Sequence, residues 1–353
     1  MSGLTSKIMA ALTCASIFLA TASGARAAEN LTAETASPGN SPHLSIIHLA
    51  DVLSKEGIAD LQVQEGQTLT NSIVNVAEGK TDIAAMPIIL HFLLEKGAGP
   101  FSKQGENGAV LAGNLQALWP YNAGAYGLIT FDSTGIRSWA DIKGRTVFNG
   151  PPRGAALVNA RQAITANTGF EEGKDYNGVQ ANWGQLTPMM LDGSADAFVL
   201  PMSFPYERAI IMLSAGNVNI ISTPKEIYEG EGFQKLLKAP GNIPMEVAFE
   251  DMGYENNPGI KLISEDGIYR GMGTAFADVV HKDMDRELVK SITSAYIAAM
   301  DDMKAKAPYV KNIGLGNLDA TASGFCGPLS LKYHPGAVEA WEEAGVTVPE
   351  CAK

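Results

Sequence analysis

Short apolar runs alternate along the chain with longer stretches in which apolar residues recur every three or four positions. The short runs have the length and composition of buried strands, and the longer stretches have the period of amphipathic helices. The predicted strands are 60–65, 82–86, 125–131, 146–149, 195–200, 218–221 and 275–280. The predicted helices are 45–55, 69–78, 155–168, 186–191 and 286–306. Strands that alternate with helices predict an α/β fold with parallel sheets covered on both faces.

One short pattern occurs twice, each time after a helical stretch. The segments 79–87 and 193–201 both read Gly-x-x-Asp, then four apolar residues, then Pro. The Gly ends a helix, the Asp starts a tight turn into a short buried strand, and the Pro ends that strand. Two copies favour two lobes of similar construction, and the alternative is a coincidence between two short segments. The chain length also exceeds the usual size of a single core.

The two copies also predict where a ligand binds. In open α/β sheets, ligands lie beyond the carboxyl ends of the strands. Here those ends are Met86 and Pro87 in one half of the chain and Pro201 and Met202 in the other. Two lobes that face each other across these ends form a cleft, so these four residues are candidates for ligand contact.

The most informative loop, 149–156, follows a predicted strand and opens a predicted helix. Its glycines let the backbone approach a ligand, and the helix start offers unpaired N–H groups and positive potential. Arg153 adds a planar, permanently charged fork that suits a carboxylate. We therefore predict an anion site that includes Pro152, Arg153, Gly154 and Ala155. The alternative is a surface turn with a solvated arginine.

Other loops supply candidates for the remaining contacts. Ser37 and Asn40 lie in a Ser- and Gly-containing loop just before a predicted helix, where they bind ligand polar atoms or act as ordinary helix caps. Tyr121 and Asn122 precede a predicted strand, and Trp183 lies in another loop. An aromatic side chain in a cleft stacks on a ligand, whereas one in a core only packs, and both interpretations stay open.

The N-terminus has the pattern of a secretory signal. Lys7 precedes an apolar run over 8–22, and small residues suited to a signal peptidase follow at 25–27. We predict a signal peptide over 1–27, and the alternative is a retained membrane anchor. Cys14 lies within the apolar run, a poor position for lipid attachment. In the exported remainder, Cys326 and Cys351 form an even pair that predicts a disulfide, with two free thiols as the alternative.

The net charge and the missing motifs argue against several classes of partner and of enzyme. The chain carries 26 basic and 38 acidic side chains, which argues against nucleic acid and anionic membrane surfaces as partners. The spacings of phosphate loops, dinucleotide loops, zinc-binding motifs and the Gly-x-Ser-x-Gly nucleophile turn are missing. The five histidines have no metal-ligand spacing. We therefore expect no metal, no cofactor and no enzymatic activity.

Several segments together resemble the TAXI-type solute receptors of tripartite ATP-independent periplasmic (TRAP) transporters. The resemblance extends over almost all of the predicted mature chain, and the Tyr-His-Pro-Gly-Ala stretch near its end is the most specific part. The segments that carry it are 77–86, 132–147, 150–156, 191–198 and 333–337, followed by Trp341. Two departures concern the site: the first loop has less Gly and Thr than the family commonly has, and Arg153 replaces a small residue.

The resemblance implies a type II periplasmic-binding-protein-like fold with two α/β lobes. Lobe 1 would comprise 28–122 plus 271–353, lobe 2 would comprise 123–270, and strands near 125–131 and 275–280 would cross between them. The implied protein is a periplasmic monomer that captures a small organic anion: a dicarboxylate, a 2-oxoacid or an acidic amino acid. It would deliver this ligand to TRAP membrane subunits for uptake driven by an ion gradient.

Two other interpretations stay open. The first is the receptor of an ATP-driven importer for sulfonates or thiamine precursors, which would share the lobe architecture. The second is a secreted hydrolase with Ser37 as nucleophile. That reaction needs a histidine within hydrogen-bond reach, and His43 and His48 are the nearby candidates in the sequence.

Overall fold

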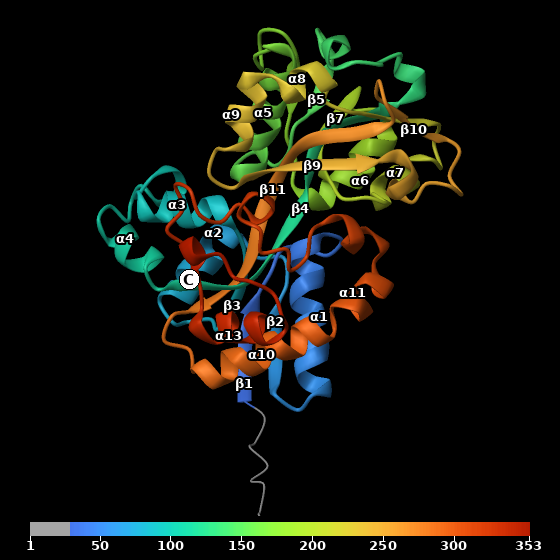
Figure 1. Ribbon diagram of the computed structural model, residues 1–353. Coiled ribbons are helices and arrows are strands. Elements are labelled where there is room, and N and C mark those ends of the chain that lie inside the picture. The colour runs from blue at the N-terminus through green and yellow to red at the C-terminus, as the bar shows by residue number, and fades with distance from the viewer. Residues whose placement is uncertain (1–28) are drawn as a thin grey trace, which may run out of the picture.

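The computed structural model describes residues 29–353. The chain folds into two bodies stacked one above the other, with two long strands, β4 and β11, running through both (Figure 1). The predicted signal peptide over 1–27 lies outside the described residues, as does Cys14. Within residues 29–353, no helix has both the length and the apolar character needed to cross a membrane.

The first body, which we call lobe 1, is built on one hydrophobic core from the two ends of the described chain. Its sheet has the order β2-β1-β3-β11-β4, in which β1, β2 and β3 are parallel and β11 runs antiparallel to its neighbours. Its strands are β1 (Glu29–Glu34), β2 (Ala59–Gln64), β3 (Ile83–Pro87) and β12 (Lys332–Tyr333), with the lower parts of β4 (Leu115–Phe131) and β11 (Ile268–His281). Its helices are α1 (Ser41–Lys55), α2 (Leu69–Ala77), α3 (Ile88–Glu95), α4 (Asn107–Ala112), α10 (Arg286–Ala298), α11 (Met300–Lys306), α12 (Ala320–Ser323) and α13 (Pro335–Glu343), with short 3-10 helices η1 (Gly99–Phe101), η5 (Pro308–Asn312) and η6 (Glu350–Ala352).

The second body, lobe 2, contains two further cores drawn from the middle of the chain. Its parallel strands β5, β6 and β7 continue the sheet beyond β4. Strand β8 pairs with β4 and with β10, and β9 pairs with β11. The strands are β5 (Thr146–Phe148), β6 (Asn177–Val179), β7 (Ala197–Met202), β8 (Val218–Ile221), β9 (Asn242–Ala248) and β10 (Ile260–Ile263). The helices are α5 (Ala155–Thr168), α6 (Trp183–Asp192), α7 (Glu207–Met212), α8 (Lys225–Glu229) and α9 (Glu231–Leu237), with η2 (Asp132–Thr134), η3 (Trp139–Ile142) and η4 (Phe249–Met252).

The two crossing strands are longer than the sequence predicts. They pair with each other from Leu115 opposite His281 to Tyr126 opposite Met272, with two register shifts between. Nearly every residue of both strands is buried, because each strand passes from the interior of one lobe into the interior of the other. The predicted runs 125–131 and 275–280 each correspond to only one end of a crossing strand.

The repeated segments have the same role in each lobe. The Asp82 carboxylate accepts hydrogen bonds from the backbone N–H of Thr32 at 2.7 Å and from its Oγ1 at 2.8 Å. The Asp196 carboxylate accepts from the backbone N–H of Thr146 at 2.8 Å. Each Asp thus links the start of its own strand to the parallel neighbouring strand, β3 to β1 and β7 to β5. The sequence analysis assigned the Asp only to a turn and missed this link. The prediction that the second Pro ends its strand is wrong, because β7 continues to Met202 beyond its pairing with β5.

The predicted helix 286–306 is two helices. Ala299 ends α10 and precedes α11 with φ −99° and ψ 3°, outside helical values. Its N–H donates to the carbonyls of both Ala295 and Tyr296, which tightens the last turn. Its own carbonyl accepts from His48 Nε2 at 2.9 Å, so lobe 1 packing fixes the break.

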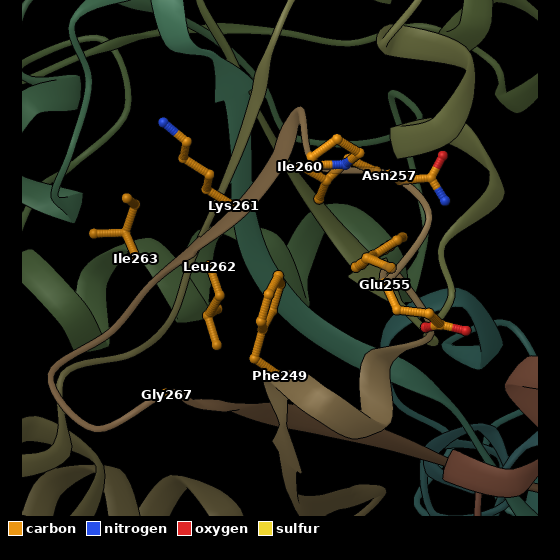
Figure 2. A pocket seen from close by; sticks show the side chains of 10 residues that line it. Phe249, Glu255, Asn257, Ile260, Lys261, Leu262, Ile263 and Gly267 are labelled. Carbon is orange, nitrogen blue, oxygen red and sulfur yellow. The ribbon is translucent and has the colours of Figure 1, made fainter.

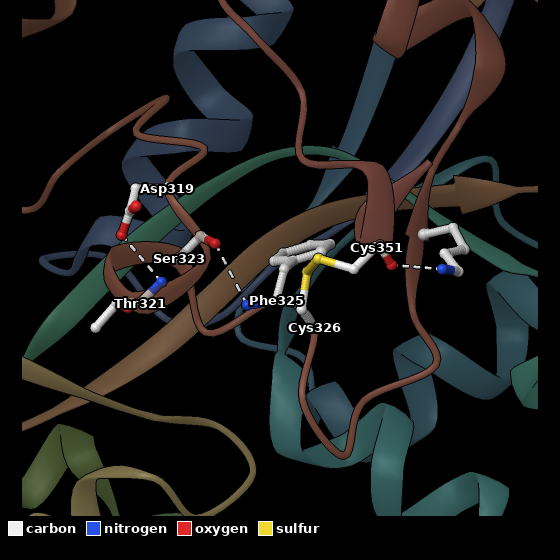
Figure 3. Close-up of a disulfide and its surroundings, with 7 residues drawn as sticks. Asp319, Thr321, Ser323, Phe325, Cys326 and Cys351 are labelled. Carbon is white, nitrogen blue, oxygen red and sulfur yellow. Dashed lines mark hydrogen bonds between the residues drawn. A yellow bond between two sulfur atoms is a disulfide. The ribbon is translucent and has the colours of Figure 1, made fainter.

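The predicted disulfide between Cys326 and Cys351 is confirmed, with their Cα atoms 5.5 Å apart (Figure 3). It joins the C-terminal 3-10 helix η6 to the segment after α12. The Phe325 ring beside it stacks on Tyr333 at 4.4 Å between centroids. This covalent link holds the chain end against lobe 1.

Candidate functional site

The loop before α5 exposes the start of that helix. Gly150 and Gly154 have φ of +111° and +97°, a backbone conformation that favours glycine. Gly154 is the N-cap residue of α5 and has no side chain that could accept from the first N–H groups of the helix. These groups carry the positive end of the helix dipole. The loop therefore presents unpaired donors where the sequence predicts an anion site.

Arg153 is exposed beside this helix start. Among residues 29–353, no carboxylate lies within ion-pair distance of its guanidinium. The other basic residue near the loop, Arg161, is occupied, because its Nε donates to Glu172 Oε2 at 2.7 Å. Arg153 thus has its charge and its donors available for a ligand.

The base of the loop is fixed by a buried polar network. Asn149 is fully buried, and its Nδ2 donates to Glu172 Oε2 at 2.6 Å. Gln180 Nε2 donates to Asn149 Oδ1 at 2.7 Å. The hydrogen bond from Arg161 lowers the pKa of Glu172 and keeps it charged. Because these contacts fix the root of the loop, its tip is presented in one position.

In the lobe 1 loop before α1, the candidate Asn40 acts as a helix cap. Asn40 is the N-cap of α1: its Oδ1 accepts from the N–H of His43 at 3.0 Å, and its Nδ2 donates to the carbonyl of Ser37 at 2.7 Å. The structure thus shows for Asn40 the capping role that the sequence left open. Ser37 lies half-buried in the same loop.

Three candidates meet where the lobes join. In the sheet register, Phe276 of β11 lies between Pro87 of β3 and Tyr121 of β4, and Asn122 follows opposite Ala275. The ring centroids of Tyr121 and Phe276 are 5.8 Å apart. Pro87, Tyr121 and Asn122 are all buried, and Tyr121 belongs to the lobe 1 core.

The lobe 2 candidates divide into two groups. Pro201 and Met202 lie opposite Tyr126 and Ala125 on β4, close to the junction. Met202 is fully buried in a lobe 2 core, and Met86 is fully buried in the lobe 1 core, so both side chains pack inside their own lobe. Trp183 begins α6 and lies edge-on to Phe148 at 6.5 Å between centroids, packed against a lobe 2 core.

The sequence analysis missed a polar cluster on the crossing strands. Asn159 of α5 is buried, and its Nδ2 donates to Thr274 Oγ1 of β11 at 3.4 Å. Asn159 also contacts Tyr126 of β4, whose pKa is raised by burial. The signal was present, because Asn159 interrupts the apolar face of α5 formed by Leu157, Ala160 and Ala163.

A buried carboxylate lies under the same junction. Asp278 of β11 is fully buried and accepts hydrogen bonds from Ser45 Oγ, Trp119 Nε1 and Tyr121 Oη at 2.5, 2.9 and 2.9 Å. Burial raises its pKa to about 7 despite these donors. Tyr296 stacks on Trp119 at 3.8 Å and shares Ser45 Oγ.

Two hollows of the surface lie away from the candidate residues. A hollow of about 450 Å³ lies between β10 and η4, where Phe249 and Leu262 are among the lining residues (Figure 2). A second, of about 450 Å³, lies along α5 and α9. None of the candidate residues lines either hollow. Within residues 29–353, no group of three or more His, Cys, Asp or Glu side chains is arranged to hold a metal ion.

Structural comparison agrees with this architecture. A protein of Bordetella bronchiseptica RB50 matches with a TM-score of 0.50 at 14% identity, over 91% of this chain and 99% of that one. A TRAP periplasmic solute binding protein from Ralstonia eutropha H16, with bound (S)-2-acetolactate, matches with a TM-score of 0.44 at 14% identity, over 92% and 87%. The periplasmic aliphatic sulphonate binding protein of Escherichia coli matches with a TM-score of 0.44 at 11% identity, over 91% and 89%.

The two α/β lobes and the crossing strands have the predicted type II periplasmic-binding-protein-like architecture. No curated protein matches the chain in sequence. A family model described as NMT1-like matches residues 34–345. The chain therefore belongs to the NMT1-like family.

Proposed function

We propose that the chain is a periplasmic solute receptor that binds a small organic anion between its lobes. The ligand class is a dicarboxylate, a 2-oxoacid or an acidic amino acid. One observation carries the proposal: the uncapped start of α5 lies beside Arg153, which has no ion-pair partner among the described residues. A carboxylate at this position would gain a charge-assisted fork and backbone donors together.

The other wall would come from lobe 1 and the junction. Ser37 would offer a hydroxyl, and Pro87, Tyr121 and Asn122, which lie close together in the sheet register, would form the floor. Pro152, Gly154 and Ala155 would bring their backbone close to the ligand from the lobe 2 side. Closure of the lobes about β4 and β11 would add ligand contacts that exist only in the closed arrangement. A ligand that binds the closed arrangement more tightly than the open one shifts the population toward closure.

The transporter assignment extends the proposal. By the resemblance to TAXI-type receptors, the closed protein would deliver its ligand, as a monomer, to TRAP membrane subunits. The TRAP receptor of Ralstonia eutropha H16 holds a small carboxylate, (S)-2-acetolactate, which is the chemistry proposed here. Export by the predicted signal over 1–27 would bring the receptor to the periplasm.

The receptor of an ATP-driven importer stays the second candidate, because Arg153 and a helix start suit a sulfonate as well as a carboxylate. For the hydrolase, the structure gives the histidines other partners. His43 Nε2 lies 3.1 Å from Glu65 Oε1, and His48 bonds the Ala299 carbonyl through Nε2 and contacts Lys306 through Nδ1. His43 and His48 therefore each have a partner other than Ser37.

A thermal-shift screen tests the proposal. The panel contains dicarboxylates, 2-oxoacids, acidic amino acids, sulfonates, neutral amino acids and sugars. A ligand at 100 times its Kd adds about 2.7 kcal/mol to the free energy of unfolding, a shift of a few degrees at this size. We expect shifts with one or a few small carboxylates. Shifts with sulfonates alone would favour the ATP-driven importer, and shifts with neutral compounds alone would contradict the anion site.

A further inference from the structure

One side chain of lobe 1 holds two backbone carbonyls of lobe 2. Asn312 ends η5, and its Nδ2 donates to the carbonyl of Phe204 and to the carbonyl of Asp251, at 3.0 Å each. Val310 and Ile313, on either side of Asn312, are buried in the lobe 1 core. Phe204 is buried in a lobe 2 core, and Asp251 lies in η4 of the same lobe. The contact therefore bridges the two bodies outside the crossing strands.

Both ends of this contact are fixed to their own lobes. The Phe204 ring packs edge-on against Tyr269, with centroids 4.6 Å apart, inside lobe 2. On the other side, the N–H of Asn122 donates to the Ile313 carbonyl at 2.7 Å and ties the end of η5 to β4. Movement of one lobe relative to the other therefore acts directly on the Asn312 hydrogen bonds.

A second pair of residues lies at the same boundary. Burial raises the pKa of Tyr309 in η5 to about 12, and the negative charge of Glu207 in α7 contributes in the same direction. Tyr309 belongs to the segment that packs on the lobe 1 core, and Glu207 belongs to lobe 2. Two side chains of η5, Tyr309 and Asn312, thus interact with lobe 2, and Asn312 does so by hydrogen bonds.

We propose that Asn312 is a positioning residue that latches lobe 1 to lobe 2 in the arrangement seen here. Its amide has two N–H donors, and the two carbonyls of the other lobe use them. A rotation about β4 and β11 that separates η5 from η4 breaks both bonds, so the latched arrangement is favoured as long as Asn312 is present. The effect on ligand affinity rests on the proposed receptor function, whereas the effect on lobe arrangement does not.

Removing two neutral hydrogen bonds is expected to change the ratio of latched to unlatched molecules roughly tenfold or more. A change of that size is visible as a second population in a distance distribution between the lobes. Asn312→Asp should act at least as strongly as Asn312→Ala, because its carboxylate oxygen replaces the donor and faces the two carbonyls. Asn312→Ser, whose hydroxyl reaches at most one carbonyl, should be intermediate.

The test is a spin-label distance measurement on the full chain. Labels are placed at Lys80→Cys in lobe 1 and Lys174→Cys in lobe 2, both exposed, with Cys14→Ser to remove the third native cysteine. We expect the distance distribution to broaden or shift for the Asn312 variants. The control Lys311→Ala, which changes an exposed neighbour in η5, should keep the parent distribution. Unchanged distributions for folded Asn312→Ala and Asn312→Asp would overturn the latch.

The same variants separate the latch from the receptor function. Circular dichroism first confirms that each variant is folded. A changed distance distribution in a chain that binds nothing from the carboxylate panel supports the latch and contradicts the receptor. Unchanged distributions in a chain that binds a carboxylate support the receptor and contradict the latch. If both hold, the Asn312 variants should also change the apparent Kd severalfold, since affinity depends on the populated fraction of the competent arrangement.

Discussion

At the scale of single residues, Asp278 shows how burial and hydrogen bonding compete on one carboxyl group. Ser45, Trp119 and Tyr121 all donate to it and favour its charged form. Desolvation favours the neutral form more strongly, and the pKa rises to about 7. In the part of the chain that the structure describes, the side-chain partners of Asp278 are these three neutral donors, so no cation there offsets the desolvation. The folded protein therefore holds this proton at pH values where an unfolded chain has released it.

Asp278 predicts a pH dependence of stability with a definite sign. Its pKa is raised in the folded state, so its contribution is fully present below pH 3.8 and is lost as the pH rises to about 7. Asp278→Asn stays neutral throughout. Relative to wild type, the variant should therefore gain roughly 1–4 kcal/mol in free energy of unfolding between pH 4 and pH 7.

Denaturant unfolding of both proteins at several pH values measures this difference. The amide changes the hydrogen bonds to Ser45, Trp119 and Tyr121, which adds a constant offset, so the slope of the difference is the diagnostic. Parallel stability curves for the two proteins across this range would contradict the raised pKa.

Residue types predicted part of the candidate site and missed the rest for a physical reason. Arg153 and Gly154 could be proposed from the sequence because a charge and a glycine next to a helix start predict an anion site from local position alone. Asn40 fits the capping alternative, because its neighbours along the chain satisfy both ends of its amide. Thr274 and Asp278 were missed because their partners lie on other strands and helices, at separations of 115 and 233 residues.

At the scale of elements, the repeated Gly-x-x-Asp unit is a tie between parallel strands. Asp82 holds the N–H of Thr32 on β1, and Asp196 holds the N–H of Thr146 on β5. The sequence pattern predicted the strand in both lobes. Of the two partner strands it predicted β5 but not β1, because β1 mixes polar and apolar residues and reads poorly as a buried strand.

Removing the Asp196 carboxylate should destabilise the start of β5, whose Thr146 N–H it accepts from. Asp196→Ala leaves the Thr146 N–H without its acceptor, so we expect a loss of about 1–3 kcal/mol in free energy of unfolding and faster hydrogen exchange at that amide. Asp196→Asn keeps an acceptor and should cost less. Asp60→Ala, an exposed change on β2, serves as the control. Equal exchange at Thr146 in wild type and Asp196→Ala would show that the tie contributes nothing.

The disulfide is the second element-scale prediction. Its sequence separation of 25 residues gives an expected loss of about 3 kcal/mol when the Cys326–Cys351 bond is removed. We expect Cys326→Ser with Cys351→Ser to lower the midpoint of chemical unfolding. Reducing agent should lower the midpoint of the wild type and leave the double variant unchanged. A reduced wild type as stable as the oxidised one would contradict a stabilising role.

At the scale of the whole molecule, the two crossing strands decide the architecture. One end of each was predicted as a strand, and the α/β class followed from alternation alone. Their full length was not predicted, because 115–124 combines Trp119, Pro120 and Gly124 in a run that lacks a simple strand pattern. The pairing of β4 with β7, β8 and β11 is a long-range property that no local period contains.

We propose that the ligand binds at the junction of the lobes. In the proposed site, the start of α5 would face the ligand from lobe 2, and Tyr121 and Asn122 of β4 would form the floor. Asn312 bridges the lobes away from these residues in sequence, at η5. A substitution at Asn312 therefore changes the lobe arrangement directly and, if the receptor function holds, changes ligand affinity through that arrangement.

Isothermal titration of the wild-type protein and Arg153→Ala with a carboxylate from the thermal-shift screen tests the central claim most directly. Lys238→Ala removes one exposed positive charge from the same lobe and is the matched control. Loss of a charge-assisted hydrogen bond should raise the Kd of Arg153→Ala roughly 10- to 100-fold, with the control unchanged. A Kd within twofold of wild type for Arg153→Ala would contradict the proposed anion site.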